Sequence, residues 1–77
     1  MRAYVEIRVE PGADIRALSH IIRTLAGVRM ACTVIGHTDI FATLEASDPK
    51  GLADIVVQKI LTIRGVASTE TLICFEG

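Results

Sequence analysis

The sequence lacks several features on which whole classes of proteins depend. It contains no Asn, no Trp, only one Tyr and two Phe, and no run of Lys or Arg accompanies its net charge of −1. Nucleic-acid binders need a basic surface interleaved with aromatic residues, so this chain is not expected to bind nucleic acid directly. No apolar stretch reaches the ~18 residues of a membrane span, so we expect no association with a membrane.

The chain is, by contrast, rich in apolar residues for its size. Hydrophobic residues make up 51% of its 77 residues, and its mean hydropathy is +0.49. A chain of this length forms one domain, here residues 1–77, and buries about 60% of its extended surface. Because one small core cannot hold so many apolar side chains, we expect some of them to face another subunit.

Hydrophobic periodicity predicts four strands and two helices. Residues 3–9 alternate between apolar and polar, which is typical of a strand with one buried face. Apolar residues after Asp14 recur at helical spacing, and Gly27 suits the end of that helix. Asp48 and Pro49 suit the start of a second helix. The predicted elements are a strand at 3–9, a helix from Asp14 to Gly27, strands at 28–35 and 40–45, a helix from Pro49 to Ile63 followed by Gly65, and a strand at 69–75.

The two halves of the chain resemble each other. TLAGV at 24–28 matches TIRGV at 62–66, and TVI at 33–35 matches TLI at 71–73. A doubled βαβ unit with right-handed crossovers predicts a ferredoxin-like βαββαβ sandwich of the α+β class. In this fold a four-stranded antiparallel sheet lies under two helices, and the second and fourth strands form its edges.

Two surfaces remain uncovered in this arrangement. The polar side of the first and third strands should lie open, and we expect it to pack against the same face of a second copy. The second helix is apolar over more than half of its circumference, which predicts a second contact in a larger oligomer; the alternative is a wide core stripe with a few exposed aliphatic residues. The residues expected in the sheet-to-sheet dimer are Tyr4, Glu6, Arg8, Phe41 and Thr43, with Glu45 on the same face, and those expected in the higher-order contact are Ala53, Val57 and Leu61.

Little in the sequence points to catalysis. It has no GxSxG, GxGxxG or GxxxxGK motif, so we predict no catalytic residue, no cofactor and no enzymatic activity. His20, near Arg16 and Arg23 on one side of the first helix, is expected to be a solvated surface residue. Cys32 and Cys74 fall on opposite sheet edges, too far apart for a disulfide, and are expected to be buried and inert. Because no CxxC pair is present, no metal site is expected.

The segment from Val34 to Ile40 is the most informative part of the chain. Gly36 allows another group to approach the backbone closely, and Asp39 offers an acceptor for an ammonium group or for free backbone N–H groups. One interpretation is a loop that binds a small molecule at a subunit interface, where ligand sites are common. The other is an ordinary hairpin turn capped by its own Asp39.

Five segments in this order resemble the effector-binding domain of the Lrp/AsnC transcriptional regulators, also called the RAM module. The resemblance covers essentially the whole chain. The segments are AYVEIRV at 3–9, LAGV at 25–28, VIGHTDI at 34–40, IRGV at 63–66 and TETLI at 69–73.

The resemblance implies a dimer whose sheets pack face to face, and further assembly into rings, often of eight subunits. It also implies that amino acids or similar small metabolites bind between dimers, near the loop joining the second and third strands. Of the family's Gly-x-Tyr-Asp pattern, Gly36 and Asp39 match, Thr38 replaces the aromatic residue, and His37 adds a titratable group. Asp39 would pair with the ammonium group of the ligand and backbone N–H groups around Gly36 with its carboxylate. The ligand-binding residues implied in this way are Gly36, His37, Thr38, Asp39, Thr69 and Thr71.

We expect no counterpart of the family's DNA-binding helix-turn-helix, because the first predicted strand begins at residue 3. We therefore expect a stand-alone, cytoplasmic effector domain: a non-enzymatic oligomer that senses an amino acid and modulates transcription by co-assembly with a full-length Lrp/AsnC regulator. Two alternatives remain open. One is a protein–protein interaction module without a ligand, and the other is a small dimeric α/β-barrel enzyme, which the wholly apolar core face of the predicted sheet disfavours.

Overall fold

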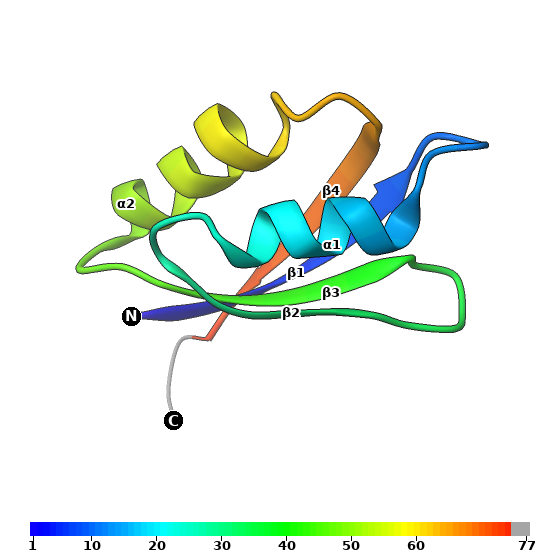
Figure 1. Ribbon diagram of the computed structural model, residues 1–77. Helices are drawn as coiled ribbons and strands as arrows, with labels where there is room; N and C mark the ends of the chain where they lie inside the picture. The colour runs from blue at the N-terminus through cyan, green and yellow to red at the C-terminus, as the bar shows by residue number, and fades with distance from the viewer. Residues whose placement is uncertain (75–77) are drawn as a thin grey trace.

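The strands and helices follow one another in the predicted order over residues 1–74, the part of the chain that this computed structural model describes. The four strands form one antiparallel sheet in the order β2-β3-β1-β4, so β2 and β4 are its edges, as predicted (Figure 1). The arrangement is the predicted ferredoxin-like α+β fold. The elements are β1 (Arg2–Val9), α1 (Ile15–Arg23), β2 (Val28–Thr33), β3 (Ile40–Glu45), α2 (Pro49–Asp54), the π-helical segment η1 (Ile55–Ile60) and β4 (Val66–Ile73).

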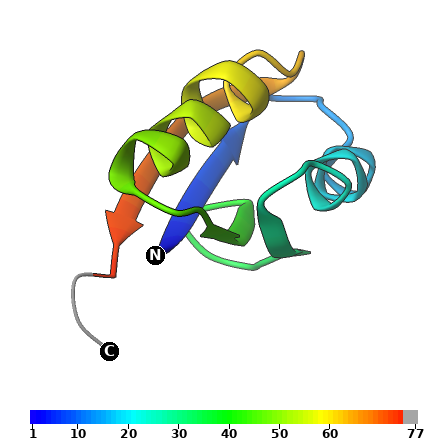
Figure 2. The same cartoon turned by 90° about the vertical axis from the view of Figure 1, so that its left-hand side faces the viewer.

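The hydrophobic core lies between one face of the sheet and the helices, which all cover that face (Figure 2). Successive side chains of a strand point to opposite faces, and every second residue is fully buried in β3 and, as far as Ile7, in β1. The intervening residues of both strands form the open face, as the alternation in the sequence predicts. The buried strand residues are Ala3, Val5, Ile7, Ile40, Ala42 and Leu44, and the helical segments cover them with Leu18, Ile22, Leu52, Ile55, Val56 and Ile60.

Both helices begin where the sequence predicts. Asp14 caps α1, its Oδ1 accepting the backbone N–H of Ala17 at 3.0 Å. Asp48 caps α2 by accepting the N–H of Gly51 at 2.7 Å, and Pro49 is the first helical residue, where its missing N–H costs nothing. These short polar side chains replace bonds that the first turn of a helix cannot make for itself.

The helices end earlier than predicted, and several strand boundaries also differ. The helix α1 stops at Arg23, and η1 stops at Ile60, because a tight turn rather than a further helical turn leads up to each glycine. β2 ends at Thr33 rather than 35, and β4 begins at Val66 rather than 69. The predicted end of the last strand, residue 75, lies outside the described residues.

The internal repeat is confirmed by matching hydrogen bonds in these two turns. After α1, Leu25 N–H donates to Ile22 O and Val28 N–H to Leu25 O, both at 3.1 Å. After η1, the equivalent bonds run from Ile63 to Ile60 at 3.1 Å and from Val66 to Ile63 at 3.2 Å. Gly27 and Gly65 complete the turns with φ angles of +91° and +103°, which side chains disfavour.

The second half of the second helix is π-helical, which the sequence does not predict. Leu61 N–H donates to Val56 O, five residues back, at 2.8 Å. In α2, which precedes this segment, Lys50 Nζ donates to Asp54 Oδ2 at 3.0 Å, and this bond raises the pKa of Lys50 above its ordinary value. Val57 and Leu61 remain 58% and 42% exposed, so the predicted outer apolar side of this helix is present.

Gly27 offers a direct test of the turn that follows α1. A Cβ at this position would overlap Ile55 Cδ1 and would also stand 3.4 Å from Glu45 O. We expect Gly27→Ala to lower the free energy of unfolding by about 1–3 kcal/mol, measured by urea denaturation. The matched control is Gly12→Ala, where φ is +84° and a Cβ meets nothing within 4 Å. Equal losses of stability in the two variants would show that the overlap with Ile55 does not destabilise the Gly27→Ala variant.

The two cysteines belong to opposite edges of the sheet, and no disulfide joins them. Cys32 lies on β2 and Cys74 directly follows β4. Both are half-buried, so the expectation that they are buried is wrong: Cys32 stands on an edge strand, and Cys74 lies beyond the end of one. Within residues 1–74, no helix is long and apolar enough to cross a lipid bilayer.

Candidate functional site

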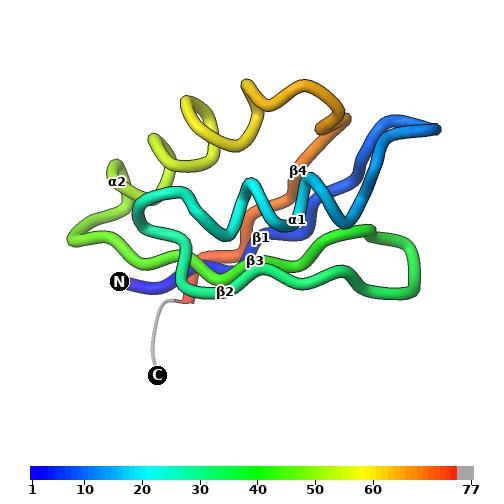
Figure 3. Tube along the Cα trace, in the orientation of Figure 1, coloured from blue at the N-terminus to red at the C-terminus, as the bar shows by residue number. Residues whose placement is uncertain are grey.

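The loop joining β2 and β3 lies at one end of the sheet, opposite the N-terminus. The turn that follows β1 and the beginning of β4 lie at the same end (Figure 3). This placement follows from antiparallel pairing, since β1 and β2 both run toward this end and β3 and β4 both start from it. Residues of three separate segments therefore come together around residues 34–39.

Thr38 and Asp39 fasten this loop to β1. The Thr38 hydroxyl donates to Ile7 O at 3.1 Å, and the backbone N–H of Asp39 donates to the same carbonyl at 3.0 Å. The Asp39 carboxylate then accepts the backbone N–H of Val9 through Oδ2 at 2.9 Å. Thr38 is 8% exposed and Asp39 half-buried, so these bonds are partly shielded from water. The loop is thus built on β1 rather than held only by its own turn.

The bond from Val9 to Asp39 lies where β1 continues beyond the first residue of β3. The pairing of β1 with β3 ends at Ile7 and Ile40, so the Val9 N–H, which points to the same side as Ile7 O, has no partner in β3. Asp39 supplies an acceptor there, so its carboxylate caps a neighbouring strand. This differs from a turn capped by its own Asp39, and it commits one carboxylate oxygen to the protein.

A pocket of about 160 Å³ opens beside the loop, between the ends of β1 and β4. Its polar character comes from the open face of the sheet, where Glu6 and Glu70 stand directly opposite each other in the β1–β4 register. Ser68 of β4 likewise stands directly opposite Arg8 of β1. The residues that line the pocket are Glu6, Arg8, His37, Thr38, Ser68, Thr69 and Glu70.

The charges in this pocket are arranged unevenly. Two like charges directly opposite on antiparallel strands are destabilising, and Glu6 and Glu70 are such a pair. His37 Nε2 lies 3.7 Å from Glu6 Oε2, but the histidine side chain is 79% exposed. Arg8 adds a guanidinium to the lining. The pocket therefore presents two carboxylates and one cation, a set that can bind an ammonium group and a carboxylate together.

The structure brings together only part of the predicted ligand-binding set. His37, Thr38 and Thr69 line the pocket. Gly36 does not line it. Among the described residues, no atom lies within 4 Å of a Cβ placed at Gly36, so none makes the close backbone approach that the sequence predicts there. Thr71 pairs with Val5 on the helix-covered side of β4, outside the pocket.

Sequence reasoning missed Ser68 and Glu70 as pocket residues, and it assigned Glu6 and Arg8 to the dimer interface alone. The alternation of β4 places residues 68, 70 and 72 on the open face, which was the available signal. The register that sets Glu70 against Glu6 was not available, because pairing between β1 and β4 depends on the whole fold.

The opposite end of the open face is aromatic and apolar. The rings of Tyr4 and Phe41 are stacked with their centroids 5.9 Å apart. Thr43 lies across from Tyr4 on β3, and Met30 and Leu72, which flank this group on the edge strands, are 42% and 51% exposed. The open face therefore divides into an apolar end and the polar pocket.

The charged rim of the apolar end involves Arg2. Interactions with the Tyr4 side chain, and then with Glu45, raise the pKa of Arg2 above its ordinary value. Among residues 1–74, no three His, Cys, Asp or Glu side chains are grouped so that they could hold a metal ion.

The fold is that of a small βαββαβ domain with a polar pocket at one end of its sheet, and comparison with known families places it in a class of ligand-binding domains. The profile of the Lrp/AsnC ligand binding domain matches residues 2–77. The chain belongs to this family.

Individual relatives give the same result. An uncharacterized HTH-type transcriptional regulator of Pyrococcus horikoshii, PH1916, is 31% identical over 75 residues, which are 95% of this chain and 50% of that protein. The crystal structure of TTHA0845 from Thermus thermophilus matches with a TM-score of 0.91 at 37% identity and covers 99% of this chain and 94% of that one. The chain thus spans about half the length of the curated relative.

A third comparison shows the fold alone. The transcriptional regulator NMB0573 from Neisseria meningitidis, crystallised as a complex with L-Met, matches with a TM-score of 0.85 at 17% identity. The match covers 97% of this chain and 49% of that protein.

Proposed function

We propose that this chain is a non-enzymatic sensor that binds an amino acid and responds through its oligomeric state. The observation that carries the proposal is the pocket where Glu6 and Glu70 face each other beside Arg8. An α-ammonium between the two carboxylates would relieve their repulsion, and Arg8 would take the α-carboxylate. The complex of the Neisseria meningitidis regulator with L-Met is consistent with a ligand of this class.

The predicted residues take different roles in this proposal. His37, Thr38 and Thr69 contact the ligand, since they line the pocket. Asp39 acts chiefly by positioning the loop through its bond to Val9, and its second oxygen is the part that can meet an ammonium. Gly36 and Thr71 contact only a ligand that extends past the pocket.

The pocket also suits a site at the border of a subunit contact. We propose that the apolar end of the open face, with Tyr4, Phe41 and Thr43, packs against a second copy, leaving Glu6 and Arg8 at the border. Ile35, in the adjoining loop, is fully exposed and apolar, as expected of a residue that meets another subunit. Ala53, Val57 and Leu61 on the second helix form the contact between dimers in an octamer or similar ring.

Regulation of transcription would follow from mixed assembly. The curated relative is an HTH-type regulator of which this chain matches one half. We propose that the chain co-assembles with such a full-length Lrp/AsnC regulator through the same surfaces and adjusts its response to the ligand. A ligand-free interaction module remains the second candidate, because the exposed Val57 and Leu61 would serve it equally well.

The proposal is tested by titrating each of the twenty amino acids into the protein and measuring heat of binding. We expect one or a few to bind, and Glu70→Gln to weaken their binding about tenfold or more, since hydrogen bonds to charged groups contribute ~1.5–3 kcal/mol. The apo variant should be as stable as the wild type or slightly more stable, because a like-charge pair has been removed.

The matched control is Glu10→Gln, which removes a carboxylate from an exposed residue just beyond β1 that does not line the pocket. Its affinity should stay within about twofold of the wild type. Asp39→Ala should lower both affinity and stability, since Val9 loses its acceptor. If no amino acid binds, the ligand-free interaction module explains the structure better. If Glu70→Gln and Glu10→Gln weaken binding equally, the pocket is not the amino-acid site.

A further inference from the structure

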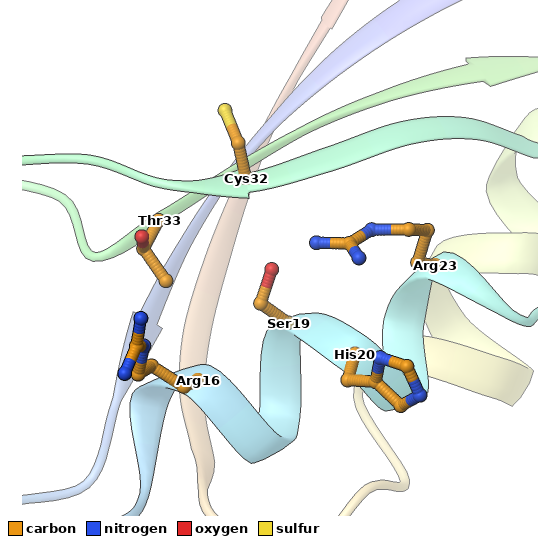
Figure 4. Close-up of a pocket in the computed structure, with 6 residues that line it drawn as sticks. All are labelled: Arg16, Ser19, His20, Arg23, Cys32 and Thr33. Carbon is orange, nitrogen blue, oxygen red and sulfur yellow. The ribbon is translucent and has the colours of Figure 1, made fainter.

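A second cluster of polar side chains lies on the other side of the sheet, between α1 and β2. Arg16, Ser19, His20 and Arg23 are spaced i, i+3, i+4 and i+7 along α1 and therefore share one side of the helix. Together with Cys32 and Thr33 of β2 they line a pocket of about 280 Å³ (Figure 4). The amino-acid pocket proposed above lies at the end of the open face and shares none of these residues.

Ser19 is the unusual member of this cluster. It is 2% exposed, and its hydroxyl has no hydrogen-bond partner within residues 1–74. A buried hydroxyl without a partner costs about 1–3 kcal/mol, so such groups are rare and call for an explanation. Figure 4 shows that the Ser19 hydroxyl points into the space between α1 and β2, beside the Arg23 guanidinium.

Arg23 is already held in place. Its Nε and Nη2 donate to Ala31 O on the edge strand β2 at 3.3 and 3.2 Å. A guanidinium carries five N–H donors in a rigid plane, so three remain to bind another group. Because the protein itself fixes the guanidinium, little side-chain entropy is lost when a ligand binds.

The pocket is cationic on balance. In the described part of the chain no acidic side chain lines it, and neither Arg16 nor Arg23 has a carboxylate partner. In Figure 4 Arg16 and Thr33 border the end of the pocket away from Arg23, whereas the Cys32 sulfur points to the opposite side of β2. Two arginines and a buried hydroxyl thus border one small space.

We propose that this α1–β2 pocket binds a phosphoryl group, either as inorganic phosphate or on a small phosphate monoester. The donors come from both ends of the pocket and from the helix beneath it, which suits a tetrahedral group with three or four acceptor oxygens better than a planar carboxylate with two. Arginine is the residue that recognises phosphate oxygens best, through paired N–H donors. The Ser19 hydroxyl gains its missing partner when the phosphoryl group is bound.

The test is a titration followed by backbone NMR at constant ionic strength, with inorganic phosphate, glycerol 3-phosphate, sulfate and acetate as probes. We expect saturable shifts confined to α1 and β2, and weaker binding of acetate than of the tetrahedral anions. Tighter binding of the monoester than of the free ion identifies a phosphorylated metabolite as the ligand, and the reverse order identifies inorganic phosphate. Shifts that do not saturate, or equal binding of acetate, would overturn the proposal.

Three variants separate a site from general attraction to a positive surface. Arg16→Ala and Arg23→Ala should each weaken phosphate binding about tenfold or more, whereas Arg64→Ala, an exposed arginine outside the pocket, should change it less than about twofold. Equal losses from all three would overturn the proposal.

Ser19→Ala supplies a readout that a merely structural role would not give. The variant without phosphate should be at least as stable as the wild type, because an unpaired buried hydroxyl has been removed. Its phosphate affinity should nevertheless fall several-fold. An affinity equal to that of the wild type would exclude the hydroxyl from the site and overturn the proposed explanation of its burial. Because amino-acid binding depends on Glu70 and not on this pocket, the two proposals fail independently.

Discussion

Replacing Val57 with glutamate is expected to reduce the assembly of this protein to dimers. Val57 is 58% exposed on the outer side of the second helix, four residues before Leu61. In the proposed ring this surface is buried between dimers, and a carboxylate buried there without a partner costs several kcal/mol. Each ~1.4 kcal/mol changes an association constant tenfold, so the ring should be lost at micromolar concentration.

The measurement is size-exclusion chromatography with light scattering, and the chain supplies a close control. Gln58→Glu adds the same charge at the next residue, which is also exposed but does not continue the series of residues 53, 57 and 61. This control should assemble like the wild type, and circular dichroism should show both variants folded. A wild-type protein that is dimeric at all concentrations, with and without amino acids, would remove the second interface from the proposal.

Truncating Ile22 to alanine is expected to destabilise the domain severely. Ile22 is fully buried on the side of α1 that packs against the sheet. Removing a large aliphatic side chain from a core costs about 2–5 kcal/mol of stability, because less apolar surface is buried away from water on folding and a cavity is left. A chain of this length has only about 4–12 kcal/mol of total stability, so much of the folded population is at risk.

Ile21, the preceding residue, provides the same substitution in the same helix. It is 45% exposed, and Ile21→Ala should change the free energy of unfolding by less than about 0.5 kcal/mol, since surface substitutions have small effects. Both variants should be compared by urea unfolding at one protein concentration, because assembly contributes to apparent stability. Similar losses from Ile21→Ala and Ile22→Ala would mean that Ile21 is buried in a subunit contact.

The proposed ligand site and the proposed assembly are linked through their positions. A ligand whose site lies at the border of a subunit contact stabilises the assembly that contains this contact by mass action, and the assembly in turn strengthens binding of the ligand. The loop that supplies His37 and Thr38 to the pocket also carries Ile35, which is fully exposed and apolar. Adding the amino acid that binds should therefore shift the wild-type protein toward larger oligomers more than it shifts the Val57→Glu variant.

Much of the fold could be predicted from the sequence because its signals are local. Alternation in 3–9 and 40–45 gave the buried faces of β1 and β3, and Asp14 and Asp48 gave the starts of the helices. The repeat of the segments around Gly27 and Gly65 gave the doubled topology and its edge strands. The strand faces and helix starts depend on a residue and its near neighbours, and the repeat can be found by comparing two short segments of the sequence.

The tertiary structure alone decided the composition of the sites. Glu70 faces Glu6 only because β4 pairs with β1 in one register, and Asp39 accepts from Val9 only because the pairing of β1 with β3 ends before Val9. Likewise, the π-helical segment and the burial of Ser19 arise from packing of the helices on the sheet. Contacts between residues 30 or more positions apart depend on how whole elements pack. The periodicity of one segment does not determine how that segment packs against the others.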